Sequence, residues 1–341
     1  MTSFGERTNV SVVIPCRNEE SRITSLLDAL MTQSPGPGPM EIVVADGMSD
    51  DGTRSRLGEY ASSRPKWRLR VVDNLHRTIP AGLNVALRAA TGNVIVRLDA
   101  HSSPAPDYIE RCLTILEETH AANVGGVWDI EPGAETWVAR SIAAAAADPL
   151  GAGDARYRTG GAAGPVDTVP FGAFRREWLE RVGGYDESLQ TNEDYELNWR
   201  IRKAGGVVWF DPSIRCKYYA RARLRDLARQ YARYGFWKAR MVLRHTGSLR
   251  WRQFLPAGFV SASLLLLAFA AFAAWAWPVL LAGWVLYALV LLSRGIVLAF
   301  RWHEAALAAG VPVALAVMHL CWGGAFLTGA VTGLLRGFRV F

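Results

Sequence analysis

Acidic side chains follow two apolar, β-rich runs at the point where each run ends. Asp46 closes the run EIVVAD, and Asp99 and His101 follow a run that ends at Leu98. Ligands of open α/β sheets bind at the carboxyl ends of the strands, so we expect these side chains to face one crevice. A carboxylate and an imidazole two residues apart suit Mn²⁺ or Mg²⁺ on a diphosphate, and the imidazole favours the transition metal. An isolated Asp-x-His after a strand is most often a turn, but its place beside Asp46 favours the metal site.

A second acidic pair opens a helical pattern. Glu193 and Asp194 begin the stretch EDYELNWRIRKAGG. Carboxylates in a first helical turn interact favourably with the helix dipole, which is the purely structural explanation. A carboxylate on a rigid helix start that faces the crevice is also suited to act as a general base. The residues alone leave both interpretations open.

Residues 215–252 carry twelve Lys and Arg against one acid, Asp226, with apolar and aromatic residues between them at roughly helical spacing. A basic amphipathic helix just before apolar segments is typical of one that lies on an anionic membrane face. Gln230 and Arg233 share one helix face and are spaced to reach a diphosphate or an acceptor together. A nucleic-acid interface is the competing interpretation, which the apolar segments that follow disfavour.

Missing motifs disfavour several functions. No G-x-G-x-x-G follows the first predicted strand and no Walker loop occurs, which argues against dinucleotide-binding and P-loop proteins. The four cysteines form no short C-x-x-C pair, so neither a disulfide framework nor a zinc knuckle is expected. Serine-hydrolase and zinc-protease motifs are also absent.

Short β-rich runs alternate with amphipathic helical patterns over the first two hundred residues, which is typical of an α/β fold with a mostly parallel sheet. We expect strands at 10–15, 41–46, 69–73, 94–99 and 124–130, and helices over 20–31, 52–62, 81–90, 107–120, 135–147 and 193–204. The segment 148–167 is rich in Gly, Ala and Pro and predicts a long loop.

The 341-residue chain is 50% hydrophobic with a formal net charge of +7, but these averages hide an apolar C-terminal part. At about 20 residues per span, it predicts three membrane helices at about 254–277, 279–300 and 306–334, with the first break near Trp277–Pro278. We therefore expect a catalytic domain over 1–214, basic interface helices over 215–253 and a transmembrane region over 254–341. The charged residues of that region are Arg294, Arg301, Glu304, Arg336 and Arg339.

The start MTSFGERTNV lacks the basic and apolar parts of a signal peptide. We therefore expect an integral protein of the inner (cytoplasmic) membrane with its catalytic domain in the cytoplasm. Basic residues at 244–252 and Arg301 favour the cytoplasmic side for both neighbouring loops, whereas three spans would put Arg336 and Arg339 outside.

Five short motifs occur in an order that resembles the family 2 inverting glycosyltransferases of GT-A fold. The likeness covers about residues 8–240 and is greatest to membrane-anchored bacterial enzymes of exopolysaccharide assembly, such as succinoglycan-type glucosyltransferases. It implies a Rossmann-like mixed sheet. The motifs are Pro15-x-x-Asn18-Glu19, Asp46 with the SDDGT run at 49–53, Leu98-Asp99-Ala100-His101, Glu193-Asp194 and Gln230-x-x-Arg233-Tyr234.

The resemblance implies a role for each matching position. Two positions depart from the family pattern: His101 replaces the second acid of D-x-D, and Tyr234 replaces the Trp of Gln-x-x-Arg-Trp. The implied roles are a nucleotide pocket at Pro15, Asn18 and Glu19, uracil binding by Asp46, ribose, diphosphate and metal at Asp99 and His101, a base at Asp194 beside Glu193, and an acceptor or diphosphate site at Gln230, Arg233 and Tyr234. Arg175 and Arg176, after the VPFGAF run, are further candidates for contact with an anionic acceptor.

The implied reaction transfers one sugar from a UDP-sugar, such as UDP-glucose, to a polyprenyl-diphosphate-linked saccharide, with inversion and with Mn²⁺ or Mg²⁺. Such an enzyme would serve exopolysaccharide or cell-envelope glycan synthesis, and its partners would be these substrates and membrane lipids, with no nucleic acid. Three alternatives stay open: a polyprenyl-phosphate monosaccharide synthase, a processive polysaccharide synthase, and a catalytically silent, membrane-anchored binding protein.

Overall fold

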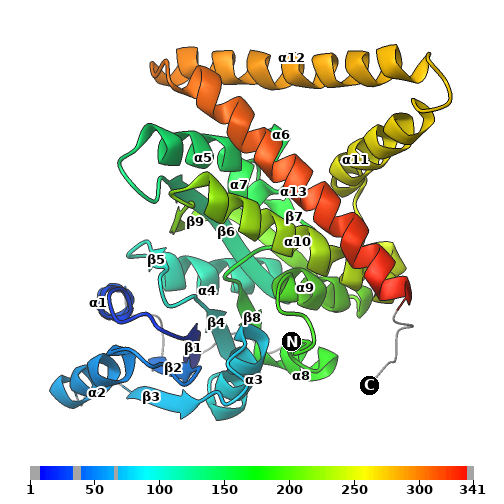
Figure 1. Ribbon diagram of the computed structural model, residues 1–341. Helices are drawn as coiled ribbons and strands as arrows, with labels where there is room; N and C mark the ends of the chain where they lie inside the picture. The colour runs from blue at the N-terminus through cyan, green and yellow to red at the C-terminus, as the bar shows by residue number, and fades with distance from the viewer. Residues whose placement is uncertain (1–7, 34–39, 65–67, 336–341) are drawn as a thin grey trace. The chain divides into compact units, whose positions relative to one another are not determined.

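The computed structural model describes residues 8–33, 40–64 and 68–335 (Figure 1). The chain divides into two compact units. The first contains residues 1–129 and 160–218, and the second contains residues 130–159 and 219–341. Arg336 and Arg339, two charged residues of the apolar tail, lie outside the described residues.

Four strands of the first unit run parallel, but other pairings are antiparallel, so the sheet is not the mostly parallel one that the alternating pattern predicted. The register sets Cys16 opposite Asp46, and Asp46 opposite Asp73, so three of these strands end at one edge of the sheet. The strands are β1 (Val10–Cys16), β2 (Met40–Asp46), β3 (Arg68–Asp73) and β4 (Val94–Arg97).

Antiparallel strands extend this sheet beyond β4, which makes it the mixed sheet that the resemblance implied. The order is β3-β2-β1-β4-β8-β6-β9-β5, and β7 pairs with β9. The further strands are β5 (Ser103–Pro104), β6 (Asn123–Glu131), β7 (Gly164–Pro165), β8 (Ala173–Arg175) and β9 (Val208–Tyr219).

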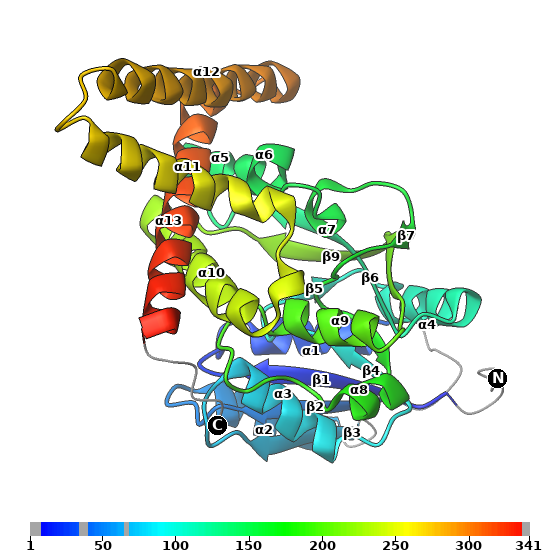
Figure 2. The same ribbon diagram turned by 90° about the vertical axis from the view of Figure 1, so that its right-hand side faces the viewer.

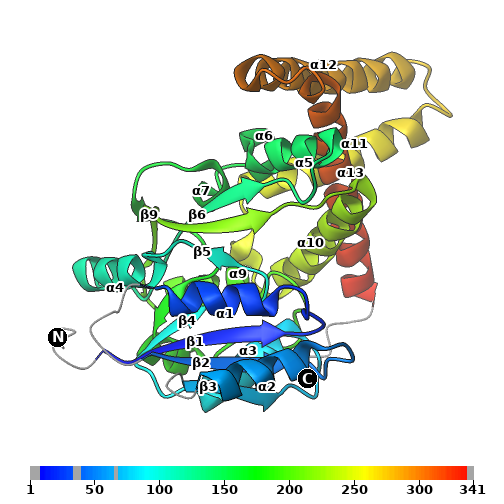
Figure 3. The ribbon, with the colours of Figure 1, turned by 90° about the vertical axis from the view of Figure 1, so that its left-hand side faces the viewer.

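Six helices of the described first unit cover the two faces of the sheet. Figure 3 looks onto the face of α1, and Figure 2 onto the face of α3, α8 and α9. One apolar cluster contains residues of α1, α2 and α4, and the other contains residues of α3, α8 and α9. The helices are α1 (Ile23–Met31), α2 (Thr53–Ser63), α3 (Ile79–Ala89), α4 (Tyr108–Thr119), α8 (Arg176–Val182) and α9 (Glu193–Lys203).

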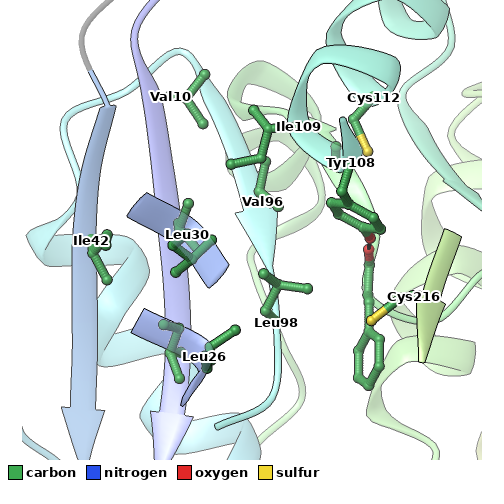
Figure 4. Close-up of a cluster of buried hydrophobic side chains, with 14 of the residues drawn as sticks. Val10, Leu26, Leu30, Ile42, Val96, Leu98, Tyr108, Ile109, Cys112 and Cys216 are labelled. Carbon is green, nitrogen blue, oxygen red and sulfur yellow. Dashed lines mark hydrogen bonds between the residues drawn. The ribbon is translucent and has the colours of Figure 1, made fainter. Parts of the chain in front are cut away.

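The alternation along β4 decides which side chains each face receives. Val96 and Leu98 pack with Leu26, Leu30 and Ile109 on the side of α1 and α4, where all five are buried (Figure 4). Successive strand residues point to opposite faces. Ile95 accordingly lies in the other cluster, and Arg97 points to the side of α9.

A buried amide network fixes α9 to the sheet. Asn198 of α9 is fully buried, and its Oδ1 accepts a hydrogen bond of 2.7 Å from Nδ2 of Asn123 in β6. Its own Nδ2 donates to Thr168 Oγ1 at 2.9 Å and to the Val169 carbonyl at 3.1 Å. Because this network holds α9 one turn beyond Glu193 and Asp194, it also fixes where the acidic pair lies.

The second unit is helical. Its long helix α13 packs along α10, as Figures 1 and 2 show. Two glycines allow this close approach. A Cβ on Gly329 would lie 2.6 Å from the carbonyl oxygen of Phe236, and a Cβ on Gly235 would collide with the carbonyl oxygen of Trp322. The helices are α5 (Trp137–Ala147), α6 (Pro149–Ala152), α7 (Arg156–Thr159), α10 (Leu224–Arg244), α11 (Trp251–Phe269), α12 (Ala276–Trp302) and α13 (Leu307–Leu335), with a 3₁₀ turn at Thr246–Ser248.

Three of these helices, α11, α12 and α13, are long and apolar enough to cross a membrane, which agrees with the three predicted spans. The predicted break near Trp277–Pro278 is wrong, because the chain leaves the helix at Phe269 and α12 begins at Ala276. Pro278 lies in the first turn of α12, where its missing N–H costs nothing.

Two further expectations are corrected. Residues 215–219 do not belong to the basic helix but end β9, where exposed Arg215 and Lys217 alternate with buried Cys216. The expected loop over 148–167 contains α6, α7 and β7. Asp148 starts α6 by accepting a hydrogen bond from Leu150 N at 2.9 Å.

Asn198→Ala should lower stability by about 2–3 kcal/mol, because it leaves the buried Asn123 amide and the Val169 carbonyl without their partner. Thermal unfolding of the purified protein should show a fall of several degrees in melting temperature. The control is Asn84→Ala, since Asn84 bonds Tyr185 from a partly exposed site where water can replace it. Equal losses in the two variants would contradict the role of the buried network.

Candidate active site

The loops that follow β1 and β2 are joined by reciprocal hydrogen bonds. Asn18 has a left-handed backbone (φ 56°), and its Nδ2 donates to Asp50 Oδ1 at 2.6 Å while its Oδ1 accepts from Asp50 N at 3.0 Å. Asn18 N donates to Ser49 Oγ at 2.9 Å, and Glu19 N donates to Thr53 Oγ1 at 2.8 Å. The motifs of the expected nucleotide pocket therefore hold one another in place.

Asp46 lies at the end of β2, fully buried, beside these loops. Its carboxylate accepts hydrogen bonds from Ser49 Oγ at 2.6 Å and from Arg54 Nε at 2.8 Å. Pro15, one residue before the end of β1, is buried and pairs in register with Ala45. Ser49 N also lies 3.3 Å from each carboxylate oxygen, so the buried Asp46 carboxylate is held by hydrogen bonds within the protein.

Glu19 reaches across to the loop after β4. Its Oε1 lies 3.0 Å from Nδ1 of His101, and both side chains are partly exposed. The hydrogen bond to Glu19 raises the pKa of His101 against the opposing effect of burial. Because an ionised carboxylate only accepts, Nδ1 is the protonated nitrogen of a neutral His101 and Nε2 carries the lone pair.

A single guanidinium connects the acidic residues of two distant elements. Arg97 Nη2 lies 3.0 Å from Asp99 Oδ1 and 3.2 Å from Glu193 Oε1, and Nη1 forms an ion pair with Asp194 Oδ2. The Arg97 side chain is 3% exposed, whereas that of Asp194 is 20% exposed. The structure thus brings Asp99 together with Glu193 and Asp194, and leaves the Asp194 side chain partly exposed.

Three carboxylates share this one positive charge, and the pKa values of Asp194 and Glu193 reflect the imbalance. Burial raises the pKa of Asp194 to about 7, since the attraction of Arg97 is offset by repulsion from Glu193 and Asp99. Burial also raises the pKa of Glu193. Burial opposes the charge of Arg97, but the surrounding carboxylates hold its pKa well above the ordinary value. A carboxylate with a pKa near neutrality is suited to exchange a proton with a substrate.

The residues near the end of β4 suit a divalent cation. Asp99 supplies a carboxylate, and His101 presents Nε2 while Glu19 fixes its other nitrogen, which is the usual outer partner of a metal-bound histidine. Within residues 8–33, 40–64 and 68–335, no group of three or more His, Cys, Asp or Glu side chains is arranged to hold a metal. Two protein ligands suit an ion that takes its remaining ligands from water and a diphosphate.

Arg175 and Arg176 do not lie with these residues. Arg175 is opposite Val94, at the start of β4 rather than its end, and Nη2 donates to the Leu116 carbonyl at 2.6 Å. Arg176 donates to the carbonyls of Gly92 and Ala90. The expectation that they contact an acceptor is corrected, because the antiparallel direction of β8 carries them to the opposite edge of the sheet.

The predicted acceptor residues Gln230, Arg233 and Tyr234 belong to α10 in the second unit. Gln230 Nε2 donates to Tyr234 Oη at 2.9 Å, so these two side chains, one turn apart, form a pair on the helix.

Sequence reasoning missed Arg97. The signal is present, because an arginine inside the buried run VIVRL carries a charge that must be compensated. The identity of its partners was not accessible, because two of them lie on α9, nearly one hundred residues later.

Comparisons with known proteins agree with this geometry. Residues 11–183 match the model of glycosyl transferase family 2. The chain is 34% identical over 330 residues to the succinoglycan biosynthesis protein ExoA of Rhizobium meliloti (strain 1021). This alignment covers 95% of this chain and 96% of that protein. A second relative is the dolichyl N-acetyl-alpha-D-glucosaminyl phosphate 3-beta-D-2,3-diacetamido-2,3-dideoxy-beta-D-glucuronosyltransferase of Methanococcus voltae. The two chains are 26% identical over 258 residues, and the alignment covers 74% of this chain and 78% of the other.

The fold is also similar to that of a solved glycosyltransferase. The mannosyltransferase PcManGT from Pyrobaculum calidifontis, in complex with GDP-Man and Mn²⁺, superposes with a TM-score of 0.58 and 23% identity over 91% of this chain and 86% of the other. The family match, the relative that spans nearly the whole chain and the mixed sheet agree: this protein belongs to glycosyl transferase family 2 and has a GT-A-like catalytic fold.

Proposed function

We propose that the protein transfers a single sugar from a UDP-hexose to a polyprenyl-diphosphate-linked saccharide in exopolysaccharide or cell-envelope glycan synthesis, with inversion at the anomeric carbon. The main support is the partly exposed Asp194 side chain, held beside Asp99 by Arg97. Further support comes from the likeness to a succinoglycan biosynthesis protein and to an enzyme whose name gives a dolichyl-linked sugar phosphate as acceptor.

Asp194 is the proposed general base. Its carboxylate takes the proton of an acceptor hydroxyl while that oxygen attacks the anomeric carbon of the donor. The new glycosidic bond forms as the bond to the β-phosphate oxygen breaks, and UDP leaves from the opposite face. Burial raises the pKa of Asp194 to about 7, and the negative charge of the neighbouring Glu193 adds to that effect.

The donor nucleotide is proposed to lie over the loops after β1 and β2. Asp46, at the end of β2, is proposed to accept the N–H of a uracil ring, with Pro15 in the neighbouring strand and Glu19 in the loop that follows it. Both polar atoms of the Asn18 side chain bond Asp50, so its contribution is to fix the loop that faces the nucleotide.

Asp99 and His101 are proposed to hold a divalent cation, with Mn²⁺ favoured by the imidazole. When bound, the cation neutralises the charge that develops on the leaving diphosphate. The Mn²⁺ in the structurally similar mannosyltransferase supports this assignment. His101 is kept in the required orientation by Glu19.

The acceptor is proposed to dock at the basic face of α10, through Gln230 and Arg233, with Tyr234 fixing the Gln230 amide. The apolar helices α11, α12 and α13 support an anchor in the inner membrane, with the catalytic unit on the cytoplasmic side. A polyprenyl carrier then presents its diphosphate at the height of such a basic helix.

A donor screen tests this function. Purified protein in lipid is incubated with Mn²⁺, a panel of labelled UDP-sugars and a membrane lipid extract. We expect one donor to release UDP and label a lipid-linked saccharide extended by one sugar. Label on a lipid monophosphate would instead indicate a monosaccharide synthase, and long products a processive synthase. No metal-dependent UDP release with any pair would contradict an enzymatic function.

Asp194→Asn should lower kcat by at least 10³-fold, because the amide cannot accept the proton, and should leave the Kd for UDP within about threefold. Turnover assays and calorimetric titration with UDP measure the two effects. Asp211→Asn is the control, since Asp211 lies in β9 and its carboxylate accepts hydrogen bonds from Ser213 of the same strand. Retained turnover in the Asp194 variant would exclude it as the base.

The rate should depend on pH in a way that identifies the base. Asp194 must be ionised to accept a proton, so kcat should fall as pH decreases through about 7. Replacing Glu193 by Gln removes a repulsion that raises this pKa, and the acid limb should move to lower pH. A pH–kcat profile whose acid limb is the same in both proteins would contradict the coupling.

Arg233→Ala should raise KM for the lipid-linked acceptor at least tenfold with little change in KM for the donor, because a charge-assisted contact to an anionic acceptor is lost. Arg229→Ala is the matched control on the same helix, since Arg229 is exposed and pairs with Asp226 at 3.5 Å. Equal effects of the two substitutions would indicate general attraction to the membrane surface.

A further inference from the structure

Arg97 is the least exposed member of the acidic site, yet it carries a full charge on a buried strand. It occupies the last position of β4, after three apolar residues. Burying a guanidinium costs several kcal/mol per ion, and well-packed apolar residues in place of a buried ion pair often give equal or greater stability. Stability alone therefore does not account for an arginine at this position.

The contacts of Arg97 are divided between two parts of the site. Nη2 faces Asp99, two residues further along the chain, and Glu193, while Nη1 faces Asp194 at the start of α9. The Phe171 ring lies 5.9 Å from the guanidinium carbon. Because the guanidinium is planar and rigid, fixing one nitrogen on Asp99 also fixes where the other meets Asp194.

We propose that Arg97 is a positioning residue for the transfer reaction, which holds the Asp194 and Asp99 carboxylates in one fixed relation. The proposal rests on the proposed function, in which Asp194 serves the attacking hydroxyl and Asp99 the leaving diphosphate. These groups act on opposite sides of one anomeric carbon, so their separation must stay constant during transfer. A displacement of about 1 Å in such an arrangement can cost about 10²-fold in rate.

Lysine in place of Arg97 separates charge from geometry. An ammonium keeps the compensating charge but is a point charge, which cannot bridge the carboxylates with two nitrogens in a fixed fork. We expect Arg97→Lys to lower kcat by about 30–100-fold, with KM for the UDP-sugar changed less than fivefold. Arg97→Met, which also loses the charge, should lower kcat further.

A partly buried arginine on α9 itself provides the matched control. Arg200 holds Glu196 through Nε and Nη2, both at 2.7 Å, and donates to the Gly184 carbonyl at 2.6 Å. Arg200→Lys breaks a similar two-point ion pair of the same helix without touching the Asp99 and Asp194 carboxylates. Its kcat should stay within threefold of the unmodified protein, even where its melting temperature falls as much as that of Arg97→Lys.

The experiment measures kcat, donor KM and melting temperature for the full-length protein and the variants. Similar losses of kcat in Arg97→Lys and Arg200→Lys would overturn the proposal, as would an Arg97→Lys protein that fails to fold where Arg200→Lys folds. Either result would make Arg97 a purely structural residue. Absence of turnover in the unmodified protein with every donor and acceptor would instead contradict the proposed function itself.

Discussion

The acidic site depends on one unequal charge balance, in which a single buried guanidinium faces three carboxylates. If all three were ionised, the cluster would carry two uncompensated negative charges in a place that little water reaches. A proton on one carboxylate or a cation beside another relieves that repulsion. Repulsion from the other two carboxylates adds to the effect of burial in raising the pKa of Asp194. The same excess of negative charge makes Asp99 a suitable ligand for a cation. The site is therefore suited to take up a proton at Asp194 and a divalent cation beside Asp99.

The architecture of the first unit serves to maintain this balance. The alternation along β4 sends Val96 to one face and Arg97 to the other, so that the charge meets α9 instead of the larger apolar cluster. Glu193 and Asp194 occur in the first turn of α9, and Asn198, one turn later, is locked to β6. The antiparallel strands beyond β4 are thus more than an extension of the sheet, because they hold the helix that carries the proposed base.

Local patterns predicted the parts of this arrangement that are themselves local. Strand ends follow from apolar runs, and the placement of Asp46 at the end of its strand needed only the alternation of strands and helices. Arg97 was overlooked because its meaning depends on partners nearly one hundred residues away. Strand β9 was missed for another reason: exposed Arg215 and Lys217 beside Pro212 obscure a two-residue alternation, and the basic composition continues into α10.

The same limitation applies to sequence motifs. A motif indicates that its residues belong to a binding pocket, but it does not show which of them contact the ligand and which only hold the loop in place. Asn18 belongs to a motif expected to line the nucleotide site, yet both its side-chain atoms bond Asp50. Charged residues of the apolar C-terminal part are also paired with residues far away in the sequence. Arg294 Nε lies 2.6 Å from Oδ2 of the buried Asp148, and Glu304 Oε1 lies 2.6 Å from Arg140 Nε. A charge in or beside a long apolar helix is costly unless a partner compensates it, and here both partners come from segment 130–159. Long-range pairing thus explains the arginine within α12 in the same way as the arginine that ends β4.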